Sequence, residues 1–435
     1  MILYVHPVSM LNGRVPAPAS KSYSIRAFII AACGGVSEIV RPSECDDAIV
    51  AMDAARFLGA NVVVPSPGVW KVIACKEGIS VAAPVEGKGS IRNEFDVRES
   101  GTVLRFLLPL LSKCGRNIVV TGKGTLKGRP NLYLIHTLRD MGIDICGYGD
   151  KESIPVKIKG GSLKGGDIYI DASLSSQFIS ALLITAPMLN QDTRLHLTGR
   201  KLVSSDYIDM TINVVNRAGV KIIKKNKRLY VIKGNQRFKG LGRFVVPSDY
   251  GLAAFIMAAA SIIKSNVILS GNFCPNFIQA DARIIDILSR MGVNFIHNSR
   301  TIKITGPFDL KGGDFSLKDC PDLVPIVSIL ALFAKTRTRL YNIQHARVKE
   351  SDRISDLRKE LLKIGARVKE RDNEIIIYPA INKYKTNVVL DAHNDHRLAM
   401  SFYVLGLKLG VRVKGIESVS KSYPGFVRDM EIISR

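Results

Sequence analysis

The sequence DYGLAAFIMAAA, Asp249–Ala260, carries the clearest structural signal in this chain. A carboxylate opens it, and small or apolar residues then fill almost every position for about three helical turns. A helix without a polar face must be buried on every side. We therefore predict a buried helix that begins close to Asp249.

Five further segments have the same design, in which a polar cluster opens directly into about ten apolar residues. Successive segments begin 73 to 79 residues apart, which is too regular for chance. We therefore predict six repeated units that together fill the chain. The six segments are Ser22–Ala32, Gly101–Leu111, Ser176–Ala186, Asp249–Ala260, Asp322–Ala334 and His396–Leu407.

A second series of predicted helices alternates with the first. Each is amphipathic, ends at a glycine and is followed by alternating apolar residues, which is the pattern of a helix, its glycine cap and a strand. Helices that are apolar all round belong inside and amphipathic ones outside, so we predict helices in the centre and sheets around them. The terminating glycines are Gly59, Gly142, Gly219, Gly292 and Gly365.

The glycine-rich, basic stretch Lys224–Arg243 interrupts this pattern between the third and fourth units. We expect the chain to cross there from one domain to another. Three units on either side predict a two-domain α/β protein with a cleft between the domains.

The composition limits the possible partners. The chain has 435 residues, 46% hydrophobic, which excludes wholesale disorder. Its 62 Lys and Arg against 38 Asp and Glu leave a net charge of +24, which calls for nucleic acid, a membrane surface or small anionic substrates as partners.

We expect no membrane-spanning helix, no secretory signal, and no disulfide or zinc site. Apolar stretches such as Tyr250–Ile263 are shorter than the roughly 20 residues that span a bilayer. The N-terminus lacks the pattern of a secretory signal, so we expect a cytoplasmic protein. The seven cysteines form no CxxC pair, which favours reduced thiols over disulfides or a zinc site.

Cations gather beside the starts of the predicted buried helices. The first turn of such a helix has unpaired N–H groups and about half a positive charge, which favours anions. Any one position is explained as well by an ordinary N-cap or a solvated charge. The recurrence of cations and N-caps at the helix starts of several units indicates one site for a strongly anionic ligand. The cations are Lys21, Arg26, Arg105, Arg129, Arg347, Lys349, Arg353, Arg397 and Lys421.

Two carboxylates are candidates for proton transfer. Glu350 lies among the cations of Arg347–Arg353, where charge or burial would tune its pKa, although an exposed helix with ion pairs would explain this run too. Asp322 opens a predicted helix, where capping alone is the alternative. His393 and His396 have the spacing of a metal pair, but no third ligand cluster accompanies them, so we expect no metal.

In several motifs the chain resembles the 5-enolpyruvylshikimate-3-phosphate (EPSP) synthase family, whose members are 3-phosphoshikimate 1-carboxyvinyltransferases. The resemblance covers nearly the whole length, and the order and spacing of the motifs make it specific. The motifs are ASKSYSIR (Ala19–Arg26), SGTVLR (Ser100–Arg105), KGRP (Lys127–Pro130), SSQF (Ser175–Phe178), LVSSDY (Leu202–Tyr207), RVKESDR (Arg347–Arg353), NDHRLAM (Asn394–Met400) and SKSYP (Ser420–Pro424).

The resemblance implies a two-domain inside-out α/β barrel of six repeated units, three per domain. It places the first strand with the C-terminal half, so that residues 1–19 and 246–435 form a discontinuous first domain and residues 20–245 the second. The active site is expected in the cleft between them.

The resemblance also implies the reaction. The carboxyvinyl group of phosphoenolpyruvate is transferred to the 5-hydroxyl of shikimate 3-phosphate and phosphate is released, with no metal or organic cofactor. We expect Asp322 to act as the base and Glu350 to carry the proton of the methyl carbon, with Lys21 assisting.

We expect a monomer with no nucleic-acid or membrane partner. Matching the chain to the family motifs position by position gives an expected set of binding residues for each substrate. Those for shikimate 3-phosphate are Lys21, Ser22, Arg26, Ser175, Ser176, Gln177, Ser204, Tyr207, Asp322 and Lys349. Those for phosphoenolpyruvate are Lys21, Gly101, Arg129, Gln177, Arg353, Arg397 and Lys421.

Glu99 departs from the family pattern, because better-known members have asparagine there. An anion at this position opposes phosphoenolpyruvate unless it is turned away or paired. His345 also stands where an asparagine contact is common.

Two rival functions are weaker. A UDP-N-acetylglucosamine enolpyruvyl transferase would carry a reactive cysteine on a loop near the donor, whereas Cys114 is expected at the end of a helix. A nucleic-acid-binding repeat protein would explain the charge, but the chain has one tryptophan and no basic motif interleaved with aromatic residues.

Overall fold

The computed structural model of the chain describes residues 1–76, 78–81, 93–115, 117–200, 202, 205–380 and 384–435. It divides into two compact units, which we describe separately. Unit 1 consists of Met1–Ser20 and Pro247–Arg435, and unit 2 of Lys21–Val246. Both are mixed α/β structures, as expected. No helix in the described ranges is long and apolar enough to cross a membrane.

Buried helices form the centre of unit 2. Nearly all their side chains are inaccessible to solvent, which confirms the prediction from their uniform apolarity, and α3 packs against both α1 and α5. They are α1 (Lys21–Ala32), α3 (Gly101–Lys113) and α5 (Ser176–Thr185). The less completely buried helices are α2 (Asp46–Phe57), α4 (Leu132–Asp140) and α6 (Ser205–Arg217).

Three four-stranded sheets complete the described part of unit 2. Each has one parallel pair followed by two antiparallel pairs. Their orders are β14 (Gly242–Val245), β3 (Val36–Val40), β5 (Val69–Ile73), β4 (Asn61–Ser66); β6 (Glu94–Asp96), β7 (Ile118–Thr121), β9 (Ser153–Gly161), β8 (Ile143–Tyr148); and β10 (Gly166–Asp171), β11 (Thr193–Thr198), β13 (Leu229–Ile232), β12 (Ile222–Asn226).

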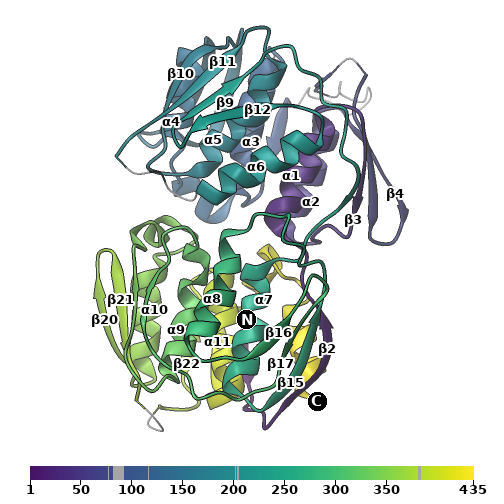
Figure 1. Ribbon diagram of the computed structural model, residues 1–435. Helices are drawn as coiled ribbons and strands as arrows, with labels where there is room; N and C mark the ends of the chain where they lie inside the picture. The colour runs from purple at the N-terminus through teal and green to yellow at the C-terminus, as the bar shows by residue number, and fades with distance from the viewer. Residues whose placement is uncertain (77, 82–92, 116, 201, 203–204, 381–383) are drawn as a thin grey trace. The chain divides into compact units, whose positions relative to one another are not determined.

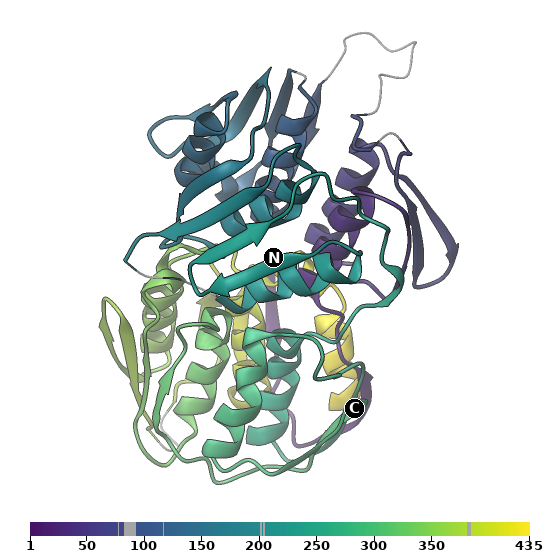
Figure 2. The ribbon, with the colours of Figure 1, turned by 45° about the horizontal axis from the view of Figure 1, so that its top comes forward.

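Unit 1 repeats this plan. Its buried helices contact one another, and within the unit they run side by side in both ribbon views (Figures 1 and 2). They are α7 (Tyr250–Ile262), α9 (Val324–Leu332) and α11 (His396–Leu409). The outer helices are α8 (Arg283–Arg290), α10 (Arg353–Lys363) and α12 (Phe426–Ser434).

Three further sheets are described in unit 1, and two of them contain strands from the N-terminus. β1 pairs with β23 and β2 pairs in parallel with β15, so the first residues of the chain belong to this unit. The orders are β16 (Phe295–His297), β17 (Thr301–Ile304), β15 (Ser265–Ser270), β2 (Leu11–Pro16); β18 (Asp314–Ser316), β19 (Thr338–Tyr341), β21 (Glu374–Tyr378), β20 (Arg367–Arg371); and β1 (Ile2–Val5), β23 (Val411–Lys414), β22 (Val389–Asp391).

Short 3₁₀ helices connect these elements. Several of them carry residues of the predicted anion site, as described below. They are η1 (Gly124–Gly128), η2 (Ala186–Met188), η3 (Ala280–Ala282), η4 (Pro321–Leu323), η5 (Gln344–Val348) and η6 (Ile416–Lys421).

The glycines predicted to end the outer helices do so. All five have φ between +83° and +98°, a left-handed conformation that favours glycine. At the end of α2, Gly59 N–H donates to Arg56 O and Ala60 N–H donates to Ala55 O, so two carbonyls of the last turn are satisfied.

The predicted domain crossing at Lys224–Arg243 was wrong. This stretch belongs to unit 2, where it contributes to the β12–β13 hairpin and to β14, and the second passage between units falls after Val246. Its lysines and arginines gave it the composition of a linker, but it contains the apolar run Leu229–Ile232, in which the buried Tyr230 and Ile232 alternate with the less buried Leu229 and Val231. That alternation is the signature of a half-buried strand.

Candidate active site

Unit 2 holds the first cluster of predicted site residues, beginning at α1. Lys21 is the first residue of that helix, and its Nζ lies 3.0 Å from Asp47 Oδ2 in the first turn of α2. Ser22 lies in the same turn, and its carbonyl accepts a hydrogen bond from Arg26 Nη1 at 2.9 Å. The pairing with Asp47 holds the lysine at the helix start.

Arg26 is a buried cation with 1% of its surface exposed. Its Nε donates to Thr211 Oγ1 at 2.8 Å and its Nη2 to Tyr207 O at 3.1 Å, while its guanidinium lies over the rings of Phe106 and Tyr207. Burial lowers the pKa of Arg26 to about 10. In the described part of the chain no carboxylate forms an ion pair with it. A buried charge balanced only by carbonyls, a hydroxyl and rings favours an incoming anion.

Gly101 allows Arg129 to approach the start of α3. A Cβ at this glycine would lie 3.0 Å from Arg129 Nη1, which is tighter than ordinary contact. Ser100 caps the helix by accepting from Val103 N. The absence of a side chain at position 101 therefore brings a guanidinium beside helical N–H groups, where both favour the same anion.

Arg105 ties α3 to the start of α5. Its Nη1 donates to Gln177 Oε1, and its Nη2 donates to Pro130 O at 3.2 Å, next to Arg129. Gln177 Nε2 donates in turn to Thr102 Oγ1 at 2.9 Å. Arg105 thus holds two of the predicted binding residues in place.

The remaining predicted residues of unit 2 lie in or beside these helices. Ser175 caps α5 by accepting from Gln177 N at 3.3 Å, and Ser176 is the first residue of that helix. Tyr207 lies in the first turn of α6 beside Arg26. Ser204 lies outside the described residues.

Glu99 is turned toward η1. A Cβ at Gly124, whose φ is +59°, would lie 2.5 Å from Glu99 Cδ, so the carboxyl group packs directly over this glycine. The carboxyl group of Glu99 therefore lies against the segment that leads into Arg129.

Unit 1 holds the second cluster, centred on Arg353 at the start of α10. This side chain is 1% exposed and pairs with three carboxylates: its Nη1 lies 2.6 Å from Asp322, its Nη2 2.7 Å from Glu350 and its Nε 2.7 Å from Asp395. Burial lowers the pKa of Arg353, but Asp395, Asp322 and Glu350 outweigh burial and raise it well above its usual value. The guanidinium of Arg353 therefore stays charged at neutral pH.

Asp322, in η4, is held by more than one cation. Arg397 Nη2 donates to it at 3.2 Å and Lys349 Nζ lies at 3.9 Å, in addition to Arg353. Burial favours the protonated form, but Arg397, Arg353 and Lys349 together hold the pKa of Asp322 well below its usual range. In this state the group is a carboxylate and a weak base.

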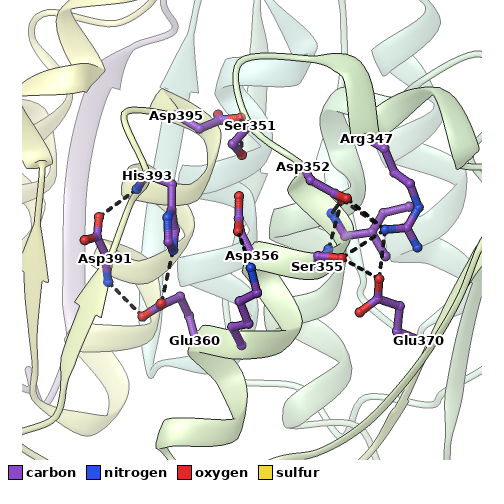
Figure 3. A network of polar contacts seen from close by, with 12 residues as sticks. Arg347, Ser351, Asp352, Ser355, Asp356, Glu360, Glu370, Asp391, His393 and Asp395 are labelled. Atoms are coloured by element: carbon purple, nitrogen blue, oxygen red, sulfur yellow. Dashed lines mark hydrogen bonds and ion pairs between the residues drawn. The ribbon is translucent and has the colours of Figure 1, made fainter. Parts of the chain in front are cut away.

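Two sets of polar contacts fix α10 (Figure 3). Near its start, Arg347 pairs with Asp352 at 3.0 Å and with Glu370 at 2.8 Å. Further along, buried Glu360 accepts from Asp391 N at 2.8 Å and lies 3.1 Å from His393 Nε2. The first set holds the segment that carries Arg353, and the second holds the loop that leads into α11.

That loop positions two more predicted residues. Asp395 caps α11 by accepting from Arg397 N at 2.8 Å. Lys421 Nζ donates to Asn394 O at 3.1 Å. The paired histidine, His393, contacts a carboxylate; within the described ranges no group of three or more His, Cys, Asp or Glu could hold a metal ion.

Sequence reasoning missed several residues. Arg105 was recognised only as one of several cations, and Asp47, Asp395 and Asp281 were not singled out. Asp395 stands in the NDHR motif next to Arg397, which is a usable signal. Asp47 and Asp281 come close to the predicted site residues only through tertiary contacts, so no sequence motif marks them.

Comparison with known proteins finds relatives over nearly the whole chain. Residues 5–430 match the family model for EPSP synthase (3-phosphoshikimate 1-carboxyvinyltransferase). A 3-phosphoshikimate 1-carboxyvinyltransferase of Methanocaldococcus jannaschii is 34% identical, covering 99% of this chain and 97% of its own length. One of Methanococcus maripaludis is 33% identical, with 99% and 98% covered.

Solved structures give the same result. An EPSP synthase from Acinetobacter baumannii superposes with a TM-score of 0.80 at 25% identity, covering 99% of this chain and 98% of that one. The enolpyruvyl transferase NikO from Streptomyces tendae, at 15% identity and a TM-score of 0.78 with 99% and 97% covered, shares the fold. The chain therefore belongs to the EPSP synthase family, the 3-phosphoshikimate 1-carboxyvinyltransferases.

Proposed function

We propose that this protein catalyses the reaction of its family, the transfer of the carboxyvinyl group of phosphoenolpyruvate to the 5-hydroxyl of shikimate 3-phosphate. The products are 5-enolpyruvylshikimate 3-phosphate and phosphate. One observation supports this above all: Arg353 and Arg397 are buried cations at helix starts, and Arg26 is a buried cation in the second turn of α1. Both substrates are anions, which such groups bind well.

We infer that both units contribute to one active site in a cleft between two inside-out α/β barrels of three repeats each. Shikimate 3-phosphate is bound by the α1, α5 and α6 residues of unit 2 together with Asp322 and Lys349. Phosphoenolpyruvate is bound by Gly101, Arg129 and Gln177 from unit 2. The remaining residues for phosphoenolpyruvate are Lys21, Arg353, Arg397 and Lys421.

The chemistry needs a base and an acid. The 5-hydroxyl oxygen attacks C2 of phosphoenolpyruvate and gives its proton to Asp322, while Glu350 delivers a proton to the methylene carbon. The C2–O bond to phosphate then breaks, phosphate leaves, and Glu350 takes a proton back from the methyl group. Lys21 and the arginines stabilise the charges of the tetrahedral intermediate.

Substrate binding itself makes Asp322 a better base. In the free protein Arg353 and Arg397 hold its pKa down. When an anionic substrate binds these arginines, it shares their charge and weakens that hold. The pKa of Asp322 then rises toward a range in which it can accept the hydroxyl proton.

The test is phosphate release by the purified protein. We expect release with shikimate 3-phosphate and phosphoenolpyruvate together and none with either alone. Replacing shikimate 3-phosphate by UDP-N-acetylglucosamine is expected to give no release, in keeping with Cys114 as the C-terminal cap of α3 rather than a loop residue. Release with the nucleotide sugar alone as acceptor would overturn the assignment.

A Gly101→Ala substitution is expected to raise the KM for phosphoenolpyruvate by about tenfold or more. The new Cβ displaces Arg129, and one charged hydrogen bond contributes roughly 1.5–3 kcal/mol. The matched control is Gly128→Ala, because a Cβ there meets nothing within 4 Å. Steady-state kinetics that show the same KM in both variants would contradict this role of Gly101.

A further inference from the structure

Asp281, in η3, lies near Arg397, and the proposed mechanism does not use it. A Cβ on Gly251 of α7 would lie 2.3 Å from Asp281 Oδ2 and 3.0 Å from Arg397 Nη1, so the carboxyl and guanidinium groups both crowd this glycine. Arg397 Nη1 also donates to Gly251 O at 2.7 Å. The absence of a side chain on this glycine leaves room for both groups.

The carboxyl group of Asp281 is buried and incompletely satisfied. The residue is 6% exposed, and its Oδ1 accepts no hydrogen bond from any described residue. A buried carboxylate without hydrogen bonds is unfavourable relative to its neutral form. The side chain is therefore placed to exchange a proton.

The groups that face Asp281 come from each neighbouring element. Asp249 caps α7, Asp322 lies in η4, Arg397 in α11, and Lys349 follows η5. The pKa of Asp281 is raised to about 7: burial is the largest cause and Asp322 and Asp249 act in the same direction, while Arg397 and Lys349 oppose them. Cys320, before η4, also interacts with it, but burial and nearby carboxylates raise the pKa of that thiol far above neutrality, so the thiol stays uncharged.

We propose that Asp281 is a positioning residue that takes up a proton when an anionic substrate binds at Arg397. This rests on the proposed function, in which phosphoenolpyruvate is that anion. The bound anion adds negative charge and occupies the cation that partly stabilised the carboxylate. A proton from water or buffer then forms the O–H bond of the neutral carboxyl, and the guanidinium is left to the substrate.

This proton uptake makes the affinity for phosphoenolpyruvate depend on pH. At low pH Asp281 is already neutral and binding requires no proton. As pH rises through and above 7, binding must draw a proton from solution, so affinity for phosphoenolpyruvate falls, by up to about tenfold for each unit that binding raises the pKa.

The kinetic test is the KM for phosphoenolpyruvate from pH 6 to 9 at saturating shikimate 3-phosphate. Relative to an Asp281→Asn variant, we expect the wild-type KM to rise about tenfold more across this range, with kcat changed less than KM. The substrate's own ionisation is common to both proteins and cancels in the comparison. The control is Asp286→Asn on α8, whose side chain is 47% exposed, and it should follow the wild type.

A calorimetric test does not need turnover. Phosphoenolpyruvate alone is titrated at pH 7.5 in two buffers with different ionisation enthalpies, which gives the number of protons taken up. We expect uptake in the wild type and in Asp286→Asn, and none in Asp281→Asn.

The outcomes separate the two proposals. Normal turnover with equal pH profiles, or with equal proton uptake, in wild type and Asp281→Asn overturns the role of Asp281 alone. Absence of turnover with proton uptake that is lost in Asp281→Asn supports this role and overturns the proposed function. Absence of both turnover and phosphoenolpyruvate binding overturns both.

Discussion

An Arg353→Met variant is expected to lose about 3–5 kcal/mol of folding free energy, because a buried cation that neutralises several carboxylates is removed. Asp395 is completely buried and Arg353 Nε lies 2.7 Å from it. Methionine fills much of the same volume, so the loss comes mainly from uncompensated charge rather than from a cavity.

Urea unfolding at pH 7 measures this loss. The control is Arg283→Met, since Arg283 is half exposed and its ion pair with Asp286 spans 3.5 Å, and its loss should not exceed about 1 kcal/mol. Equal unfolding midpoints for the two variants would show that the buried network does not stabilise the fold.

The same network predicts a pH dependence of stability. The pKa of Asp322 is lower in the folded chain than its usual value, so its contribution is present above the unfolded pKa, near 4, and is lost as pH falls toward the folded pKa. The Arg353→Met variant should therefore lose less stability than the wild type when both are acidified below pH 4.

A Glu350→Gln variant is expected to lose about 10²–10⁴-fold in kcat with a much smaller change in KM. The amide oxygen can still accept from Arg353, which lies 2.7 Å from the carboxylate, but the amide cannot carry a proton to the methylene carbon.

The matched control is Asp352→Asn, two residues further along. Asp352 caps α10 by accepting from Ile354 N and Ser355 N, which an amide oxygen also does, so its kcat should stay within about threefold of the wild type. Phosphate release by Glu350→Gln at the wild-type rate would remove Glu350 from the proton-transfer role.

Much of the architecture could be predicted from the sequence because it follows from local periodicity. The apolar run after Asp249 and the glycine stop at Gly59 depend on backbone geometry and burial that any such sequence must satisfy. The basic stretch Lys224–Arg243 misled because its overall composition resembled a linker, while the short apolar run Leu229–Ile232 inside it forms the strand β13.

The sequence by itself determined the buried helices, their starts and the family, since these are properties of neighbouring residues and of motif order. Only the tertiary structure decided the electrostatics of the site. Arg353 meets Asp395, 42 residues away, and Asp281 and Arg397 both lie against Gly251 of a third element. Such pairings depend on packing between elements, and a pKa depends on burial and on every nearby charge, so neither can be derived from the local order of residues.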